Sequence, residues 1–278
     1  MGFERVLVVG AGQMGAGIAQ VFAASGRRVL LHDAAPGAAE RGLGVMRKSL
    51  ERLAAKGQDI DTEDVLARVE AVDDLAEADL MVEAVVEDAG VKEDVFRRAD
   101  EVLPEGAVLA SNTSSIPIAS LAAVTGRPDR VIGMHFFNPA PVMALVEVVR
   151  GPETSETTLR AVVALAEELG KTPAEVNDFP GFVSNRILMP LVNEAAYALQ
   201  DGVAEAEAID TIARLGFNHP MGPLALADLI GLDTCVAIMD VLHRGLGDAK
   251  YEPCPLLREH VAAGRLGRKS GHGFYEYA

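Results

Sequence analysis

The sequence predicts an α/β protein in two parts: a doubly wound, mainly parallel sheet with covering helices over residues 1–180, and an all-helical domain over residues 181–278. Three observations support this prediction. In the first part, short apolar β-branched segments alternate with helix-forming segments, which is typical of a parallel sheet. This alternation stops near residue 180, and only helical patterns follow. The length of 278 residues fits two domains of about 150 residues each.

The composition excludes several classes of protein. Hydrophobic residues make up 49 % and charged residues 24 %, which indicates a folded protein rather than a disordered one. The formal charge of −16 argues against a nucleic-acid partner, which needs a basic face. No apolar run approaches the roughly 20 residues of a transmembrane helix, so no membrane partner is expected. Glu4 and Arg5 interrupt any signal-peptide centre, and two cysteines make no disulfide framework, so we expect a cytoplasmic protein.

The first 33 residues carry a dinucleotide-binding pattern. The segment 5–10 (RVLVVG) predicts a buried strand, 16–25 predicts a helix, and 28–32 (RVLLH) predicts a second strand. The glycine-rich sequence GAGQMG joins the first strand to the helix, and Asp33 closes the second strand. This context predicts a Rossmann-type domain, which the three glycines alone would not.

Each residue type in this pattern has a physical reason. Gly10 permits a tight turn, Gly12 lets backbone N–H groups approach a pyrophosphate, and Gly15 lets the helix pack close to the strand. Asp33, 18 residues after Gly15, is placed to accept hydrogen bonds from the adenosine ribose and to repel a 2′-phosphate. Residues 34–36 supply no cation, so the sequence favours NAD over NADP as cofactor.

A long helix is predicted over residues 37–57. It carries Lys48, Arg52 and Lys56 at a spacing of four, with Ser49 beside them. Such a strip is either a solvated helix face or a cradle for the phosphates of a substrate.

Polar residues follow two further predicted strands. Glu87 follows the strand 79–86, with Lys92 in the next helix, and Asn112 and Ser114 follow the strand 107–111. Doubly wound sheets bind ligands beyond the carboxyl ends of their strands, so these residues are candidates for a site. The alternative is that they cap helices.

The segment 130–149 predicts two apolar strands around a proline-rich turn. His135 ends the first strand, and Glu147 lies 12 residues later on the second. A hairpin-like return would bring them together. Neutral imidazole suits removal of a hydroxyl proton near pH 7, and a carboxylate on its other nitrogen fixes the tautomer.

After a helix over 155–170 and a short strand, the chain changes character. We expect helices over 183–200, 204–215, 224–246 and 256–263. No metal is expected, because the histidines of this helical part lack carboxylates or cysteines at ligand spacing: His219, His243, His260 and His272.

The sequence closely resembles the L-3-hydroxyacyl-CoA dehydrogenase family, particularly its short stand-alone 3-hydroxybutyryl-CoA dehydrogenases. The resemblance covers essentially the whole chain. It is carried by these motifs in order: VVGAGQMGAGIAQVFAASG, VEAVVED, SNTSS, HFFNPAPVMALVEVV, GFVSNRI, HPMGPLALADLIGLD and GRKSGHGFY.

The resemblance implies roles for individual residues. His135 matches the catalytic base and Glu147 its orienting partner, while Ser114 and Asn185 match residues that hold the reacting oxygen. Implied cofactor contacts are Gly10, Gly12, Gln13, Met14, Gly15, Asp33, Ala84, Glu87, Lys92, Asn112, Ser114, Asn138 and Lys269. Implied CoA contacts are Ser49, Lys56, Lys92 and Ser114. One departure is Ala34, which stands where the family often has a polar residue, so one adenosine contact is expected to be missing.

The resemblance therefore implies NAD-dependent oxidation of an L-3-hydroxyacyl-CoA, and its reverse, by a homodimer formed through the C-terminal domain. Two alternatives remain: a sugar-acid (L-gulonate-type) dehydrogenase on the same scaffold, and a non-catalytic nucleotide-binding protein. The retained catalytic residues argue against the second alternative. Acyl-chain length and pathway (fatty-acid degradation, butyrate formation or aromatic breakdown) stay open at this point.

Overall fold

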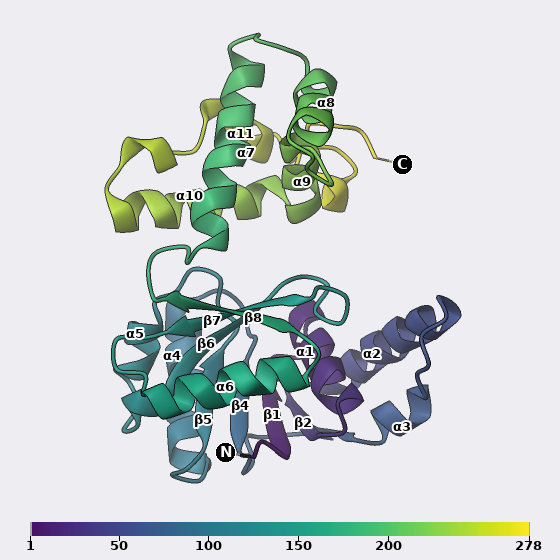
Figure 1. Cartoon of the computed structure of the whole chain (residues 1–278), viewed down its shortest axis with the longest axis vertical. Coiled ribbons are helices and arrows are strands. Elements are labelled where there is room, and N and C mark those ends of the chain that lie inside the picture. Colours follow the sequence, from purple (N-terminus) through teal and green to yellow (C-terminus); the bar gives the residue numbers. More distant parts are fainter. Residues whose placement is uncertain (1, 278) are drawn as a thin grey trace. The chain divides into compact units, whose positions relative to one another are not determined.

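The fold is that of an α/β protein with a Rossmann-type sheet followed by a helical region, as predicted (Figure 1). The computed structural model describes residues 2–277. The chain divides into two compact units, Met1–Phe179 and Pro180–Ala278. None of the helices described in either unit is long and apolar enough to cross a membrane.

The first unit is built on an eight-stranded sheet with the order β3-β2-β1-β4-β5-β6-β7-β8. Neighbouring strands run parallel except for β6 and β7, which are antiparallel. The strands are β1 (Arg5–Val9), β2 (Arg28–His32), β3 (Val69–Val72), β4 (Leu80–Glu83), β5 (Val108–Ser111), β6 (Val131–Phe136), β7 (Leu145–Arg150) and β8 (Thr172–Asn177). The strand predicted over 79–86 is shorter in the structure, because β4 covers only Leu80–Glu83 and the chain leaves the sheet after Glu83.

Helices cover both faces of this sheet. The apolar cluster that joins α1 and α6 to one face includes Ile18, Phe22 and Val162, all fully buried. Phe96 on α4 is buried as well, and Figure 1 places α4 and α5 behind the sheet, opposite α6. The helices are α1 (Gln13–Ala24), α2 (Ala38–Ala55), α3 (Thr62–Leu66), α4 (Ala89–Val102), α5 (Ile118–Ala122) and α6 (Glu156–Glu168), with a 3₁₀ turn at Pro128–Arg130.

The second unit is helical, and its core is formed by side chains such as Val192, Met239 and Leu242. Its helices are α7 (Ser184–Gln200), α8 (Ala206–Gly216), α9 (Pro223–Ile230), α10 (Leu232–Leu246) and α11 (Pro255–Ala262), with 3₁₀ turns at Ala249–Tyr251 and Arg268–Ser270. The single helix expected over 224–246 is wrong. Gly231 has φ 105°, outside the helical region, so the chain forms two helices that meet there.

Candidate active site

The predicted residues of the first unit gather at one edge of the sheet. The strands β1, β4, β5 and β6 are consecutive neighbours and parallel, so all four end at the same edge. The glycine-rich turn follows β1, Glu87 follows β4, and Asn112 and Ser114 follow β5. His135 is the penultimate residue of β6. This edge is where ligands bind in doubly wound sheets.

The three glycines at this edge divide into two kinds. A Cβ on Gly10 would lie 2.5 Å from the Ala84 carbonyl oxygen, and one on Gly15 would lie 1.7 Å from the Gly10 carbonyl oxygen. The packing of the chain itself therefore requires both. A Cβ on Gly12 would meet no atom within 4 Å, so the space beside Gly12 is open to a ligand.

The open space lies at the N-terminus of α1. Gly12 is the N-cap, it makes no side-chain cap, and the first turn holds no acidic residue. The N–H groups of that turn therefore point to a place that suits a phosphate. This arrangement fits the pyrophosphate of a dinucleotide, whose phosphates residues 12–15 would hold.

Asp33 is fixed at the end of β2. Its carboxylate accepts hydrogen bonds from the backbone N–H of Ala11 (2.7 Å) and of Ala35 (2.9 Å). Both oxygens keep lone pairs for ribose hydroxyls. Ala34 beside it is exposed and brings no cation, in agreement with the preference for NAD.

Two other predicted cofactor residues touch each other. The Gln13 Nε2 atom donates to Asn138 Oδ1 at 3.1 Å, which ties the start of α1 to the turn after β6. Met14 is partly buried against the core, and Ala84 forms the wall behind Gly10. The glycine turn and the β6–β7 hairpin are therefore joined.

His135 and Glu147 form a buried pair. They are register partners on the antiparallel strands β6 and β7, and the His135 Nδ1 atom lies 2.8 Å from Glu147 Oε2. Both residues are buried. Phe137 packs against the imidazole, with ring centroids 4.8 Å apart. The predicted hairpin thus brings the two side chains into hydrogen-bond contact.

Asn112, the residue after β5, contacts the strand that carries His135. Its Oδ1 atom accepts a hydrogen bond from the Phe136 backbone N–H at 2.8 Å. Asn112 therefore holds the end of β6 beside His135. The cofactor contact implied for Asn112 remains a prediction.

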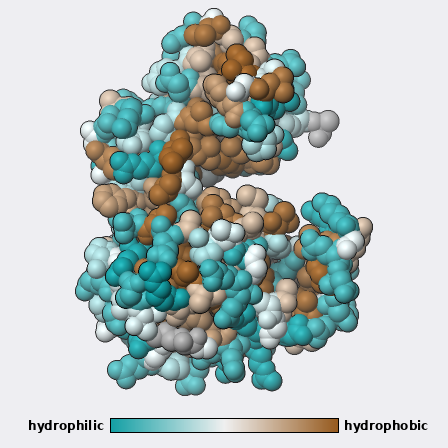
Figure 2. Space-filling view, viewed as in Figure 1, coloured by the Kyte–Doolittle hydropathy of each residue, from teal (hydrophilic) through white to brown (hydrophobic). Residues whose placement is uncertain are grey.

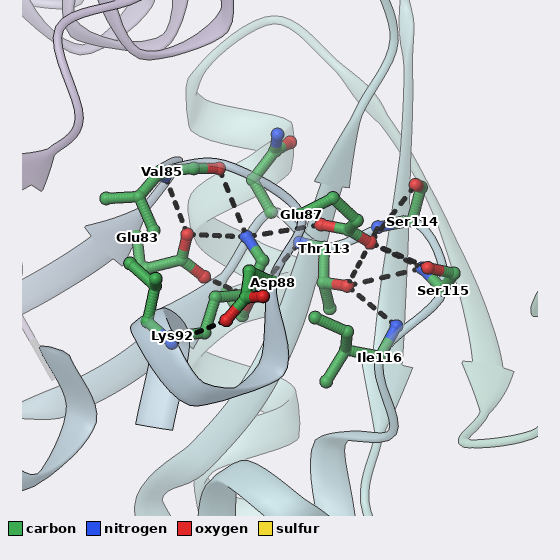
Figure 3. Close-up of polar contacts among 12 residues, drawn as sticks. Glu83, Val85, Glu87, Asp88, Lys92, Thr113, Ser114, Ser115 and Ile116 are labelled. Atoms are coloured by element: carbon green, nitrogen blue, oxygen red, sulfur yellow. Dashed lines mark hydrogen bonds and ion pairs between the residues drawn. The ribbon is translucent and has the colours of Figure 1, made fainter. Parts of the chain in front are cut away.

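Glu87 organises the loop that carries Ser114 (Figure 3). Its Oε1 atom accepts hydrogen bonds from the Thr113 hydroxyl at 2.7 Å, the Ser114 N–H at 2.9 Å and the Ser115 N–H at 3.0 Å. Partial burial acts to raise the pKa of Glu87, but the positive charge of Lys92 and these hydrogen bonds outweigh it and lower the pKa. Glu87 is therefore held as a carboxylate.

Lys92 lies inside the protein. It is 1 % exposed, and its Nζ atom lies 2.6 Å from Glu83 Oε1 and 3.3 Å from Glu87 Oε2. A direct contact with CoA, implied for this residue, does not fit such a placement, because two carboxylates surround an ammonium that solvent does not reach. We correct that expectation: Lys92 holds Glu83 and Glu87.

The basic strip on α2 is at the surface. Lys48, Arg52 and Lys56 are exposed and Ser49 is half-buried. Within residues 2–277, no carboxylate forms an ion pair with any of the three cations, whereas Arg47 on the same helix pairs with Glu63. The strip therefore presents uncompensated positive charge.

Two predicted site residues belong to the second unit. Asn185 is buried in the first turn of α7, and its N–H donates to the Gly181 carbonyl oxygen at 3.1 Å. Lys269 lies in the last 3₁₀ turn, with its Nζ atom 2.5 Å from Asp233 Oδ1.

Two buried residues near the candidate site in the first unit, Glu83 and Thr113, were not predicted from the sequence. Glu83 is the last residue of β4 and is fully buried. An acid at the end of an otherwise apolar strand was the available signal. Thr113 stood beside Ser114 in the SNTSS motif, but nothing in its residue type distinguished it.

Together, the open glycine turn, the acid at the end of β2 and the buried His–Glu contact define an NAD-dependent dehydrogenase of the Rossmann class. Two family models match the chain: "3-hydroxyacyl-CoA dehydrogenase, NAD binding domain" over residues 5–179 and "3-hydroxyacyl-CoA dehydrogenase, C-terminal domain" over residues 181–277. The chain belongs to the 3-hydroxyacyl-CoA dehydrogenase family.

Individual proteins are similar over the whole length. A probable 3-hydroxybutyryl-CoA dehydrogenase of Bacillus subtilis is 56 % identical over 282 residues, covering 100 % of this chain and 98 % of that protein. Its Deinococcus radiodurans counterpart is 59 % identical over 274 residues, covering 97 % and 99 %. The crystal structure of (S)-3-hydroxybutyryl-CoA dehydrogenase PaaH1 from Ralstonia eutropha superposes with a TM-score of 0.95 at 49 % identity, with 100 % of each chain covered.

Proposed function

We propose that this chain catalyses the reversible oxidation of an L-3-hydroxyacyl-CoA to the 3-oxoacyl-CoA with NAD, and that 3-hydroxybutyryl-CoA is its substrate. The observation that carries the proposal is the 2.8 Å contact between His135 Nδ1 and Glu147 Oε2 at the ligand-binding edge of the sheet. The names of the relatives from B. subtilis, D. radiodurans and R. eutropha support the substrate class.

The proposed chemistry follows from the orientation of the imidazole. Oxidising a secondary alcohol requires loss of the hydroxyl proton as hydride leaves carbon. When Nδ1–H donates to Glu147, Nε2 carries the lone pair and is the atom that accepts the proton. Glu147 then stabilises the imidazolium that forms. Bound NAD supplies the hydride acceptor.

We propose that Ser114 and Asn185 hold the reacting oxygen. The Ser114 hydroxyl lies 3.3 Å from Glu87 Oε1 in the loop after β5, and a hydroxyl there has the chemistry to donate to a substrate oxygen. Asn185 carries an amide that can donate in the same way, and it is assigned to this role by the resemblance. Residues 1–180 then bind NAD, and residues 181–278 contribute to substrate binding.

We propose that the strip Lys48, Arg52 and Lys56, with Ser49 beside it, binds the phosphates of CoA. Exposed cations that lack a carboxylate partner within the described residues are available to an anionic ligand. CoA carries several phosphate groups, whereas a sugar acid carries none. The strip therefore favours a CoA thioester over a sugar acid.

We propose that the protein is a homodimer formed through its helical unit. Apolar side chains stand out from α8 and the segment that follows it: Ile212, Leu215 and Phe217 are 55 %, 82 % and 62 % exposed. Figure 2 shows hydrophobic side chains gathered over α8. A contiguous exposed apolar face of this kind is typical of an interface between copies.

A cytoplasmic location is also proposed. Cys235 and Cys254 are both free and buried, and burial raises the pKa of Cys235 to about 12, which keeps it as a thiol.

The test measures the reduction of acetoacetyl-CoA by NADH, monitored as the consumption of NADH. The oxidation of L-gulonate with NAD is measured in parallel. We expect turnover with acetoacetyl-CoA and none with L-gulonate. A chain-length series of 3-oxoacyl-CoA substrates, run with NADH and NADPH, then defines the preferred substrate and cofactor. Turnover of L-gulonate alone would replace the proposal by a sugar-acid dehydrogenase, and no turnover of either would leave a nucleotide-binding protein.

A further inference from the structure

Glu83 is an acidic residue that takes no direct part in the proposed proton and hydride transfer. It ends β4 and is fully buried. A buried carboxylate is costly unless it is paired and hydrogen-bonded. Both of its oxygens accept hydrogen bonds, and the partners of both connect Glu83 to the loop 113–116.

The first route from Glu83 passes through Lys92. The Glu83 Oε1 atom lies 2.6 Å from Lys92 Nζ and also accepts the Val85 N–H at 2.7 Å. Lys92 Nζ in turn lies 3.3 Å from Glu87 Oε2. The other oxygen of Glu87 accepts the N–H groups of Ser114 and Ser115.

The second route passes through Ser111. The Ser111 hydroxyl donates to Glu83 Oε2 at 2.6 Å, and its oxygen accepts the Thr113 N–H at 3.1 Å. The Thr113 hydroxyl oxygen accepts the Ile116 N–H at 2.8 Å. As a result, four successive backbone N–H groups, 113–116, donate to side-chain oxygens that connect back to Glu83 (Figure 3).

We infer that Glu83 is a positioning residue for the reaction: through Lys92 and Ser111 it fixes the conformation of the loop 113–116 and so the place of the Ser114 hydroxyl. The inference rests on the proposed function for the identity of the reaction. Glu83 touches no substrate atom in this role. It sets the geometry of the group that holds the reacting oxygen, and small displacements of such groups slow catalysis.

The main variant is Glu83→Gln, which keeps the shape of the side chain. Its amide nitrogen cannot accept, so either Lys92 loses its acceptor or the Ser111 hydroxyl must turn and accept instead of donating, and in both cases the charged contact with Lys92 is weakened. We expect kcat and kcat/KM to fall together by about 10²-fold, with KM for acetoacetyl-CoA unchanged, because the lost geometry acts in the transition state. Ser111→Ala breaks only the second route and should show a smaller loss in the same direction. Glu70→Gln, an exposed change on β3, is the matched control.

Hydrogen exchange gives a readout that needs no turnover. Amides 113–116 should exchange about tenfold faster in Glu83→Gln than in the wild type, since their side-chain acceptors are no longer fixed. The strands β5 and β6 should be unchanged. A residue that served only the stability of the unit would raise exchange throughout the sheet instead.

If Glu83→Gln does not fold, the double variant Glu83→Gln/Lys92→Met removes both buried charges and keeps the test available. The inference is overturned if amides 113–116 exchange as in the wild type and kcat stays within about twofold, a difference too small for a lost positioning contact. An inactive wild-type protein would refute the proposed function alone, because the exchange comparison would still decide the role of Glu83.

Discussion

His135 and Glu147 face each other across the antiparallel strands β6 and β7, with Nδ1 and Oε2 2.8 Å apart. The register of the two strands creates this contact. A slip of one residue would turn Glu147 to the opposite face of the sheet. The proposed base is therefore held by the fold rather than by a flexible loop, and the functional consequences can be tested on each partner separately.

Replacing His135 by Gln removes the proposed base and keeps a polar side chain of similar reach. We expect turnover of acetoacetyl-CoA with NADH to fall about 10²–10⁴-fold, the usual contribution of general acid–base catalysis. NADH binding, measured by fluorescence titration, should be retained, because the residues that fit the dinucleotide are untouched. His243→Gln on α10 is the control. Full turnover in His135→Gln would remove this residue from the mechanism.

Replacing Glu147 by Gln tests the tautomer. The wild-type carboxylate only accepts, so it selects the imidazole with hydrogen on Nδ1, whereas a Gln amide can donate to Nδ1 and select the opposite tautomer. We expect a loss of turnover of about 10²–10⁴-fold with the fold intact. Nitrogen NMR of the His135 ring should show the proton on Nδ1 in the wild type and not in the variant. An unchanged ring tautomer together with unchanged turnover would contradict the orienting role.

The strip on α2 predicts an effect that depends on the substrate's phosphates. Lys56→Gln should raise KM for acetoacetyl-CoA about tenfold with kcat nearly unchanged, because a charge-assisted hydrogen bond contributes about 1.5 kcal/mol to binding. The acetoacetyl thioester of pantetheine lacks the nucleotide phosphates, and its KM should not respond. Arg47→Gln is the matched control, since Arg47 already pairs with Glu63. Equal effects on the two thioesters would place the CoA phosphates elsewhere.

Glu87 predicts a pH dependence of stability. Its pKa is lowered: burial opposes ionisation, but Lys92 and the hydrogen bonds of the Ser114 loop outweigh it. A carboxyl group with a depressed folded-state pKa stabilises the protein above its unfolded pKa of about 4.3 and loses this effect as pH falls through the folded value. The difference in Tm between wild type and Glu87→Gln should therefore be largest at neutral pH and should shrink below about pH 4. A difference that grows on acidification would show the opposite shift.

Local patterns predicted the part of the site that depends on strand order. The turn after 5–10, the acid after 28–32 and the hairpin around residue 140 are all encoded within a few residues of each other. Because parallel strands share one carboxyl edge, locating the strands already located Gly12, Asp33 and His135 at that edge.

The remaining features depend on tertiary packing and backbone conformation, which residue types alone do not reveal. Lys92 and Glu83 lie nine residues apart, and only the close approach of α4 to the end of β4 buries both of them. Charged residues in a sequence are normally expected at the surface, so neither the burial of Lys92 nor the role of Glu83 was predicted. The break at Gly231 was missed for a related reason, because a glycine inside an apolar helical pattern can also be tolerated within one helix.

The exposed face of α8 predicts the assembly. Leu215 is 82 % exposed although it is a large apolar residue, and Ile212 and Phe217 lie close to it in sequence. In a two-fold dimer each patch meets its own copy, so Leu215→Glu brings two like charges together in a desolvated contact, which costs several kcal/mol, roughly enough to dissociate many dimers. Light scattering should then give twice the chain mass for the wild type and a single chain mass for the variant. Val102→Glu, which changes an exposed apolar residue of the first unit, should leave the dimer intact. A Leu215→Glu protein that keeps the mass of the wild type would show that α8 is not the interface.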